Sequence, residues 1–112
     1  MEVRVHRNKR GFITSFEVKG HADYAEHGSD IVCAGVSALT QAAVLGLQQV
    51  CGLKIQMKKA PGDMECRLPA IGTPEQYSRG QAILESMILG LRGIEEEYGD
   101  YLVLIETFDS LD

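Results

Sequence analysis

Apolar residues recur along the chain with two different periods, and this divides it into predicted strands and helices. Residues 2–7 alternate between polar and apolar, and the alternation in residues 12–19 places Phe12 and Phe16 on one face. Both segments are predicted strands. The polar turn between them, residues 8–11, ends in glycine and favours an antiparallel hairpin.

A helix is predicted over residues 31–50, because this segment is rich in alanine, leucine and glutamine and carries a broad apolar surface. Gly52 lies just beyond its end, where glycine commonly terminates a helix. Either Ser29 or Asp30 can act as the N-cap.

A second hairpin and a second helix follow. Residues 54–59 and 64–68 alternate in the manner of strands on either side of a turn that contains proline and glycine. Thr73 and Pro74 then have the order of an N-cap and a first helical residue, and apolar residues recur at helical spacing as far as Tyr98.

The last strand, residues 101–105, is apolar on both faces, which predicts a central strand covered on each side. The element order is therefore ββαββαβ. It indicates one α+β domain over residues 1–112, with a mixed five-stranded sheet and both helices on one face. Because the other face then needs a cover, we expect a homodimer that buries part of the open sheet face or a helix.

Composition narrows the class of protein. The chain has 112 residues, 45% of them hydrophobic and 24% charged, as is typical of a soluble globular domain. Its net charge of −5 argues against a direct nucleic-acid surface and makes a basic peptide an easier partner. Since we find neither a secretory leader nor a stretch close to the roughly 20 apolar residues of a membrane helix, we expect a cytoplasmic protein without membrane contact.

Cys33 is the candidate nucleophile because it lies three residues after Asp30, in the first turn of the predicted helix. The positive end of the helix dipole stabilises a thiolate at this position. Backbone N–H groups of the same turn can hold the oxyanion of an acyl-transfer intermediate. Cys51 and Cys66 are interpreted as buried core thiols, since cysteine is most often a small buried residue.

His21 is the candidate base, because it follows the second predicted strand and the loop after it returns the chain to the helix start. Asp30 either caps the helix or orients the imidazole. Ser37, one turn after Cys33, can border the same site.

Other functions remain open on these residues alone. A metal site of His21, His27 and Cys33 is a weak alternative, because the paired spacing of zinc sites is missing. No cofactor or metal is therefore predicted. A non-catalytic peptide clamp, or another thiol enzyme of acyl transfer, would use the same cysteine and loop.

Residues 20–39, GHADYAEHGSDIVCAGVSAL, closely resemble the ribosomal-processing cysteine protease family, also called Prp. The likeness combines a Gly-His-Ala motif, the segment GSDIVCA and the segment VSAL, and the length and element order suit the family throughout. The resemblance implies a homodimeric bacterial enzyme. Such an enzyme removes a basic and apolar N-terminal extension from large-subunit ribosomal protein twenty-seven by cutting after an aromatic residue.

The same resemblance implies roles for individual residues. His21 would be the base and Cys33 the nucleophile, supported by Asp30 and Ser37, and Gly20 would be a hinge. The loop that follows is expected to be mobile and to order over a bound peptide. From charge alone, and not from the resemblance, we expect Asp23 and Glu26 to attract the basic substrate. The expected loop and substrate-binding residues are Gly20, Ala22, Asp23, Tyr24, Glu26, His27, Gly28 and Ser29.

Overall fold

In the computed structural model of the chain, which describes residues 1–26 and 30–109, the predicted hairpins and a final strand form one sheet. Its strand order is β3-β4-β2-β1-β5. β1 runs parallel to β5 and antiparallel to β2, and both β2 and β3 run antiparallel to β4. The strands are β1 (Glu2–Arg7), β2 (Ile13–Lys19), β3 (Gln56–Ala60), β4 (Asp63–Arg67) and β5 (Val103–Phe108).

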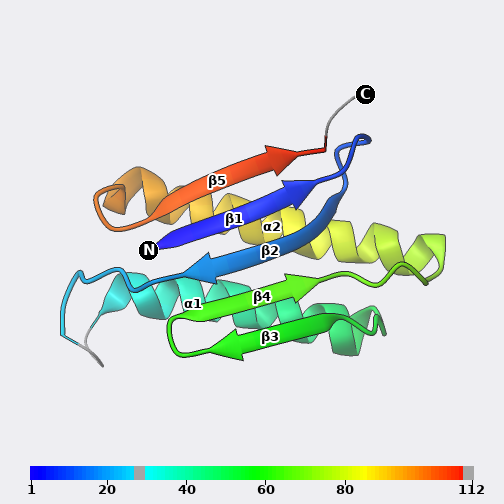
Figure 1. The fold of residues 1–112 in the computed structure, drawn as a ribbon, viewed down its shortest axis with the longest axis horizontal. Coiled ribbons are helices and arrows are strands. Elements are labelled where there is room, and N and C mark those ends of the chain that lie inside the picture. Colours follow the sequence, from blue (N-terminus) through cyan, green and yellow to red (C-terminus); the bar gives the residue numbers. More distant parts are fainter. Residues whose placement is uncertain (27–29, 110–112) are drawn as a thin grey trace.

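Both long helices, α1 (Ile31–Leu45) and α2 (Pro74–Tyr98), lie on the same face of this sheet (Figure 1). The predicted α+β class, the mixed sheet and the one-sided helical layer are confirmed. The core lies between the two layers. Its largest fully buried side chains come from the strands, the helices and the segments beside them: Val3, Val5, Ile13, Phe16, Val32, Val36, Leu47, Cys66, Leu84, Leu91 and Leu102.

The side chain of Phe12 does not share the face of Phe16, so that part of the first prediction is wrong. Phe12 is half exposed and precedes the strand, whereas Ile13 and Phe16 are both buried. The register explains the difference, since His6 pairs with Ser15 but Arg7 pairs with Ile13. This β-bulge places an extra residue in β2 and turns Ile13 to the core.

β5 is an edge strand, and the prediction of a central strand covered on both faces is wrong. Leu102 and Leu104 face the helices and are buried, but Val103 is 48% exposed on the open face. The strand lies at the edge beside β1. Because both helices cover the other face of the sheet, its second apolar row has no layer above it.

The open face of the sheet does not need the apolar cover that the sequence suggested. It carries mainly charged side chains, with ion pairs from Arg4 to Glu2 and from Arg67 to Glu65. Charged side chains on a sheet face remain favourable in water. A dimer contact is therefore better sought elsewhere.

The first helix begins where the sequence predicted. Asp30 is its N-cap, and the alternative cap Ser29 lies outside the described residues. After Leu45 the helix continues as one wider turn, η1 (Gly46–Val50), in which the Cys51 N–H bonds the Gly46 carbonyl five residues earlier. The second helix starts at Pro74 with the predicted Thr73 cap.

The sequence predicted no stretch close to the length and apolarity of a membrane helix. One described helical segment, Ile31–Val50, is nevertheless long and apolar enough to cross a membrane. Length and composition alone give this result, and core helices of soluble proteins meet the same test. Part of the apolar surface packs under the sheet through Val32, Val36 and Leu47. Other apolar side chains of this segment, Ile31, Leu45 and Val50, are exposed to solvent.

Candidate active site

His21 follows the end of β2 and lies on one wall of a cleft. Gly20 follows the strand with a φ of +81°, and its N–H donates to the Gly62 carbonyl at 2.8 Å. This bond joins the strand end to the turn between β3 and β4. His21 is exposed, whereas the next side chain, Ala22, is buried.

Cys33 lies on the opposite wall, in the first turn of α1, and is partly exposed. The Asp30 carboxylate accepts the N–H groups of Val32 and Cys33 at 3.0 Å each through Oδ1, and that of Tyr24 at 2.9 Å through Oδ2. The Cys33 bond is the main cause that lowers the pKa of Asp30. Asp30 thus caps the helix and ties the loop to it.

These bonds change two expectations about the helix start. Within the described residues, Asp30 makes no hydrogen bond to His21, so its observed role is the cap rather than orientation of the imidazole. The amides of Val32 and Cys33 are also already bonded to Asp30, so the expectation that this turn offers free amides to an oxyanion is wrong for these two groups.

A backbone amide that the sequence did not indicate lies at the sulfur instead. The Ala22 N–H donates to Cys33 Sγ at 3.2 Å, and the buried Ala22 methyl group anchors this stretch of chain. This bond places a backbone donor directly at the sulfur atom. Only the fold reveals this donor, because every residue except proline carries the same group.

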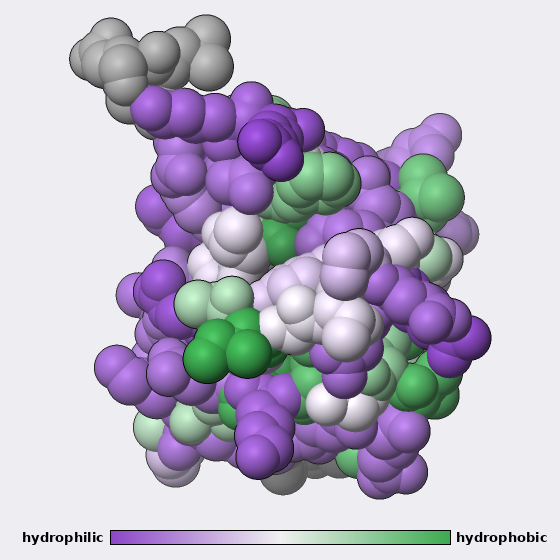
Figure 2. All heavy atoms as spheres, turned by 90° about the vertical axis from the view of Figure 1, so that its right-hand side faces the viewer, coloured by the Kyte–Doolittle hydropathy of each residue, from purple (hydrophilic) through white to green (hydrophobic). Residues whose placement is uncertain are grey.

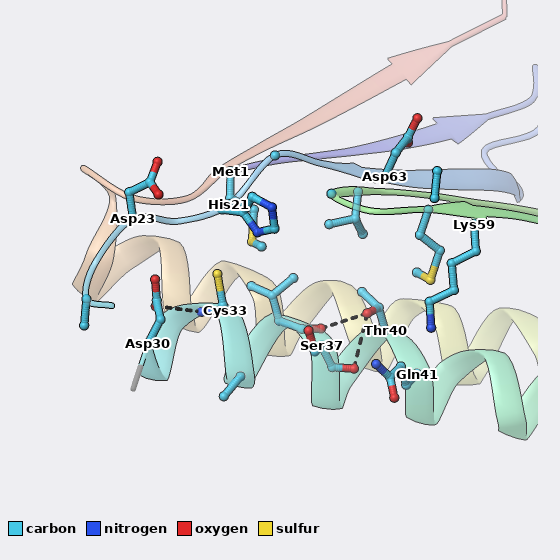
Figure 3. Close-up of a pocket in the computed structure, with 18 residues that line it drawn as sticks. Met1, His21, Asp23, Asp30, Cys33, Ser37, Thr40, Gln41, Lys59 and Asp63 are labelled. Atoms are coloured by element: carbon cyan, nitrogen blue, oxygen red, sulfur yellow. Dashed lines mark hydrogen bonds between the residues drawn. The ribbon is translucent and has the colours of Figure 1, made fainter. Parts of the chain in front are cut away.

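The cleft between the two walls has a volume of about 650 Å³. In Figure 3 the Cys33 thiol projects from α1 towards the wall that carries His21, and Ser37 lies one turn further along the helix. The apolar lining comes from Met1, Val18, Val36 and Met64. The two side chains line the same cleft, but the described residues include no hydrogen bond between the His21 ring and the Cys33 thiol.

The loop after His21 is held at its described part by aromatic contacts. Asp23 has a φ of 56°, an unusual value for a residue with a side chain. The Tyr24 ring meets Tyr98 and Tyr101 edge to face, with ring centroids 5.5 and 5.0 Å apart. Glu26 is exposed, and the predicted loop residues His27, Gly28 and Ser29 lie outside the described residues.

The β3–β4 hairpin is the part of the cleft that the sequence did not predict. Lys59, Gly62 and Asp63 line it beside α1 residues Thr40 and Gln41. No motif marks the hairpin positions, since Lys59 lies 26 residues after Cys33 and Asp63 lies 42 residues after His21.

The two other cysteines and the alternative metal site are not supported as reactive centres. Cys51 and Cys66 are buried as predicted, and burial raises the pKa of Cys66 to about 11. Among residues 1–26 and 30–109, no group of three or more histidine, cysteine or acidic side chains could hold a metal ion.

A larger hollow of about 940 Å³ lies at the opposite end of the sheet, on the face shown in Figure 2. It is lined by Phe12, Leu68 and Tyr77, among others, and contains neither cysteine nor histidine. Side-chain chemistry therefore selects the smaller cleft as the candidate active site.

Comparison with known proteins identifies the family of the chain. The family model described as cysteine protease Prp matches residues 1–103. A relative from Bacillus subtilis, named ribosomal processing cysteine protease Prp, is 35% identical over 104 residues, which are 91% of this chain and 93% of the relative. A Staphylococcus aureus protein of the same name is 31% identical over 87% of this chain and 90% of its own length.

Solved structures give the same result for the fold. A Staphylococcus aureus ribosomal processing protease Prp, crystallised with a covalently linked product peptide, superimposes with a TM-score of 0.86 and 30% identity, covering 95% of this chain and 98% of that one. SMU.848 from Streptococcus mutans gives a TM-score of 0.78 at 29% identity, over 96% and 94%. The chain therefore belongs to the Prp family of ribosomal-processing cysteine proteases and is a cysteine peptidase.

Proposed function

We propose that this protease removes the N-terminal extension of bacterial large-subunit ribosomal protein twenty-seven, cutting after an aromatic residue through a Cys33–His21 dyad. The observation that carries the proposal is the cleft that holds both side chains on facing walls. The relatives are named for ribosomal processing, and one Staphylococcus aureus structure holds a substrate peptide. A cytoplasmic location is part of the same proposal, since ribosomal proteins are made there.

The reaction follows from the chemistry of the two side chains. His21 accepts the thiol proton of Cys33, and the resulting thiolate attacks the scissile carbonyl carbon and forms a carbon–sulfur bond. His21 then donates this proton to the leaving amine as the carbon–nitrogen bond breaks. Water activated by His21 then hydrolyses the thioester and frees Cys33. The Ala22 N–H, which bonds the Cys33 sulfur in this structure, is a backbone donor available to the developing negative charge.

Specificity would arise from the lining of the cleft. Met1 and Val18 line the cleft and are partly exposed, so they offer an apolar surface to the aromatic side chain before the scissile bond. Asp23 lines the cleft and Glu26 is exposed on the same loop, so both can attract the basic residues of the substrate.

The test is cleavage of the precursor ribosomal protein, followed by intact-mass spectrometry. We expect one cut directly after an aromatic residue, and we expect replacement of that residue by alanine to lower kcat/KM by at least about tenfold, because the apolar surface of the cleft is left unfilled. Uncut precursor in the presence of an enzyme that still cleaves other peptides would refute the proposed substrate. Equal cleavage of the alanine peptide would refute the aromatic preference.

We further propose that the protein is a homodimer that meets through its helical layer. Several exposed side chains on the outward side of the two helices carry no charge, although the whole chain carries −5. Identical uncharged surfaces can meet around a two-fold axis without like-charge repulsion. This outer helical face consists of Ile31, Ala38, Ala42 and Leu45 from α1 and Ala82, Ser86, Leu89 and Gly93 from α2.

One substitution distinguishes the helical from the sheet interface. Leu89 is 74% exposed, so Leu89→Glu should leave the fold intact while placing two like charges in the contact. We expect light scattering at micromolar concentration to give a dimer mass for the wild type and a monomer mass for Leu89→Glu. Val103→Glu on the open sheet face is the control, and dissociation by this variant alone would place the contact on the sheet.

A further inference from the structure

The turn between β3 and β4 lies directly against the ring of His21. A Cβ atom built on Gly62 would be 3.2 Å from His21 Nε2 and 3.8 Å from both Cδ2 and Cε1. A side chain at position 62 would therefore press against the imidazole edge, and the ring would have to shift by a few tenths of an ångström. The Gly62 carbonyl also accepts the Gly20 N–H, so the same residue fixes the backbone just before His21.

Backbone conformation alone does not explain this contact. Gly62 has a φ of +71°, a left-handed conformation that favours glycine and that asparagine also tolerates. Gly11 has a similar φ of +85° in the β1–β2 turn, but a Cβ there would meet nothing within 4 Å. The two glycines thus share the backbone requirement and differ in what faces them.

We propose that Gly62 is a positioning residue for His21, an inference that rests on the proposed dyad. Its bare backbone supports the imidazole edge in the cleft, and its carbonyl fixes Gly20, so together they set the position from which His21 reaches Cys33. Proton transfer needs the ring nitrogen within hydrogen-bond reach of its partner. A displacement of about 1 Å can lower a rate about 100-fold.

The experiment compares Gly62→Asn with the matched control Gly11→Asn. Both variants place asparagine in a left-handed turn, but only Gly62→Asn puts its side chain where the His21 ring lies. We expect Gly62→Asn to lower kcat by about 10- to 100-fold, with KM within about twofold and an altered pH profile of kcat/KM. Gly11→Asn should match the wild type, and circular dichroism should show similar melting temperatures for both variants.

A second measurement tests whether the effect passes through His21. We expect Gly62→Asn to slow the alkylation of Cys33 by iodoacetamide, read by peptide mass spectrometry, in the wild-type background and not in His21→Ala. Loss of activity in His21→Ala together with wild-type kinetics in Gly62→Asn would refute the inference and leave the dyad standing. Full activity in His21→Ala would instead refute the dyad, and an unchanged Gly62→Asn effect in that background would show that Gly62 acts independently of His21.

Discussion

Replacing Cys33 with alanine is expected to lower kcat for peptide cleavage by at least about 10⁴-fold, because the carbon–sulfur bond of the intermediate can no longer form. The side chain is partly exposed in the cleft and the helix cap does not depend on its sulfur, since Asp30 bonds the Cys33 backbone N–H. Peptide binding should therefore remain within a fewfold of the wild-type affinity. Initial-rate assays and a fluorescence-anisotropy titration with the same labelled peptide would measure both quantities.

Cys51→Ala is the matched control for this prediction. Cys51 is also a free thiol, but it is buried beyond the end of η1 and does not line the cleft. We expect it to keep wild-type kcat at temperatures where it is folded. Measurable turnover by Cys33→Ala, or equal loss in both variants, would contradict the assignment of the nucleophile.

Replacing Phe16 with alanine is expected to lower the free energy of unfolding by about 3–5 kcal/mol, the usual cost of removing a buried aromatic ring. Phe16 is 1% exposed, faces the core from β2, and pairs with Val5 on one side and Cys66 on the other. The loss is a large part of the about 5–15 kcal/mol by which a domain is usually stable. Urea unfolding followed by circular dichroism, at one fixed protein concentration, would measure it.

Phe12→Ala gives the contrast that tests the register of β2. Phe12 is 50% exposed, so its removal should change the free energy of unfolding by less than about 0.5–1 kcal/mol. The pair therefore checks the β-bulge, which separates two phenylalanines that simple alternation places on one face. Equal losses in both variants would mean that Phe12 is buried in solution.

Local patterns in the sequence identified the helices and strands, because those patterns depend on residues that are close together in the chain. Alternation indicated the strands, and the Thr73 and Pro74 signals located the start of α2. The two candidate capping residues before an apolar run, Ser29 and Asp30, placed the start of α1 to within one residue. The position of Cys33 followed from that start. The motif around it then resembled the family to which the chain belongs.

Other properties depended on contacts between distant segments. The sequence could not show that β5 is an edge strand, because a strand's neighbours are chosen by the whole sheet. Nor could it show the bulge in β2, since an extra residue is recognised only against its partner strand. Both differences changed which apolar side chains are buried.

The sequence by itself thus determined the helices, the strands and the family, and it predicted the two side chains that we propose as the catalytic pair. Only the tertiary structure decided that Asp30 occupies two amides of the first helical turn, that the Ala22 N–H reaches the Cys33 sulfur, and that the Gly62 backbone lies against the His21 ring. The physical reason is common to all three. Each is a hydrogen bond or close contact in which the backbone is one partner, and the fold brings backbone groups together without leaving a side-chain motif in the sequence.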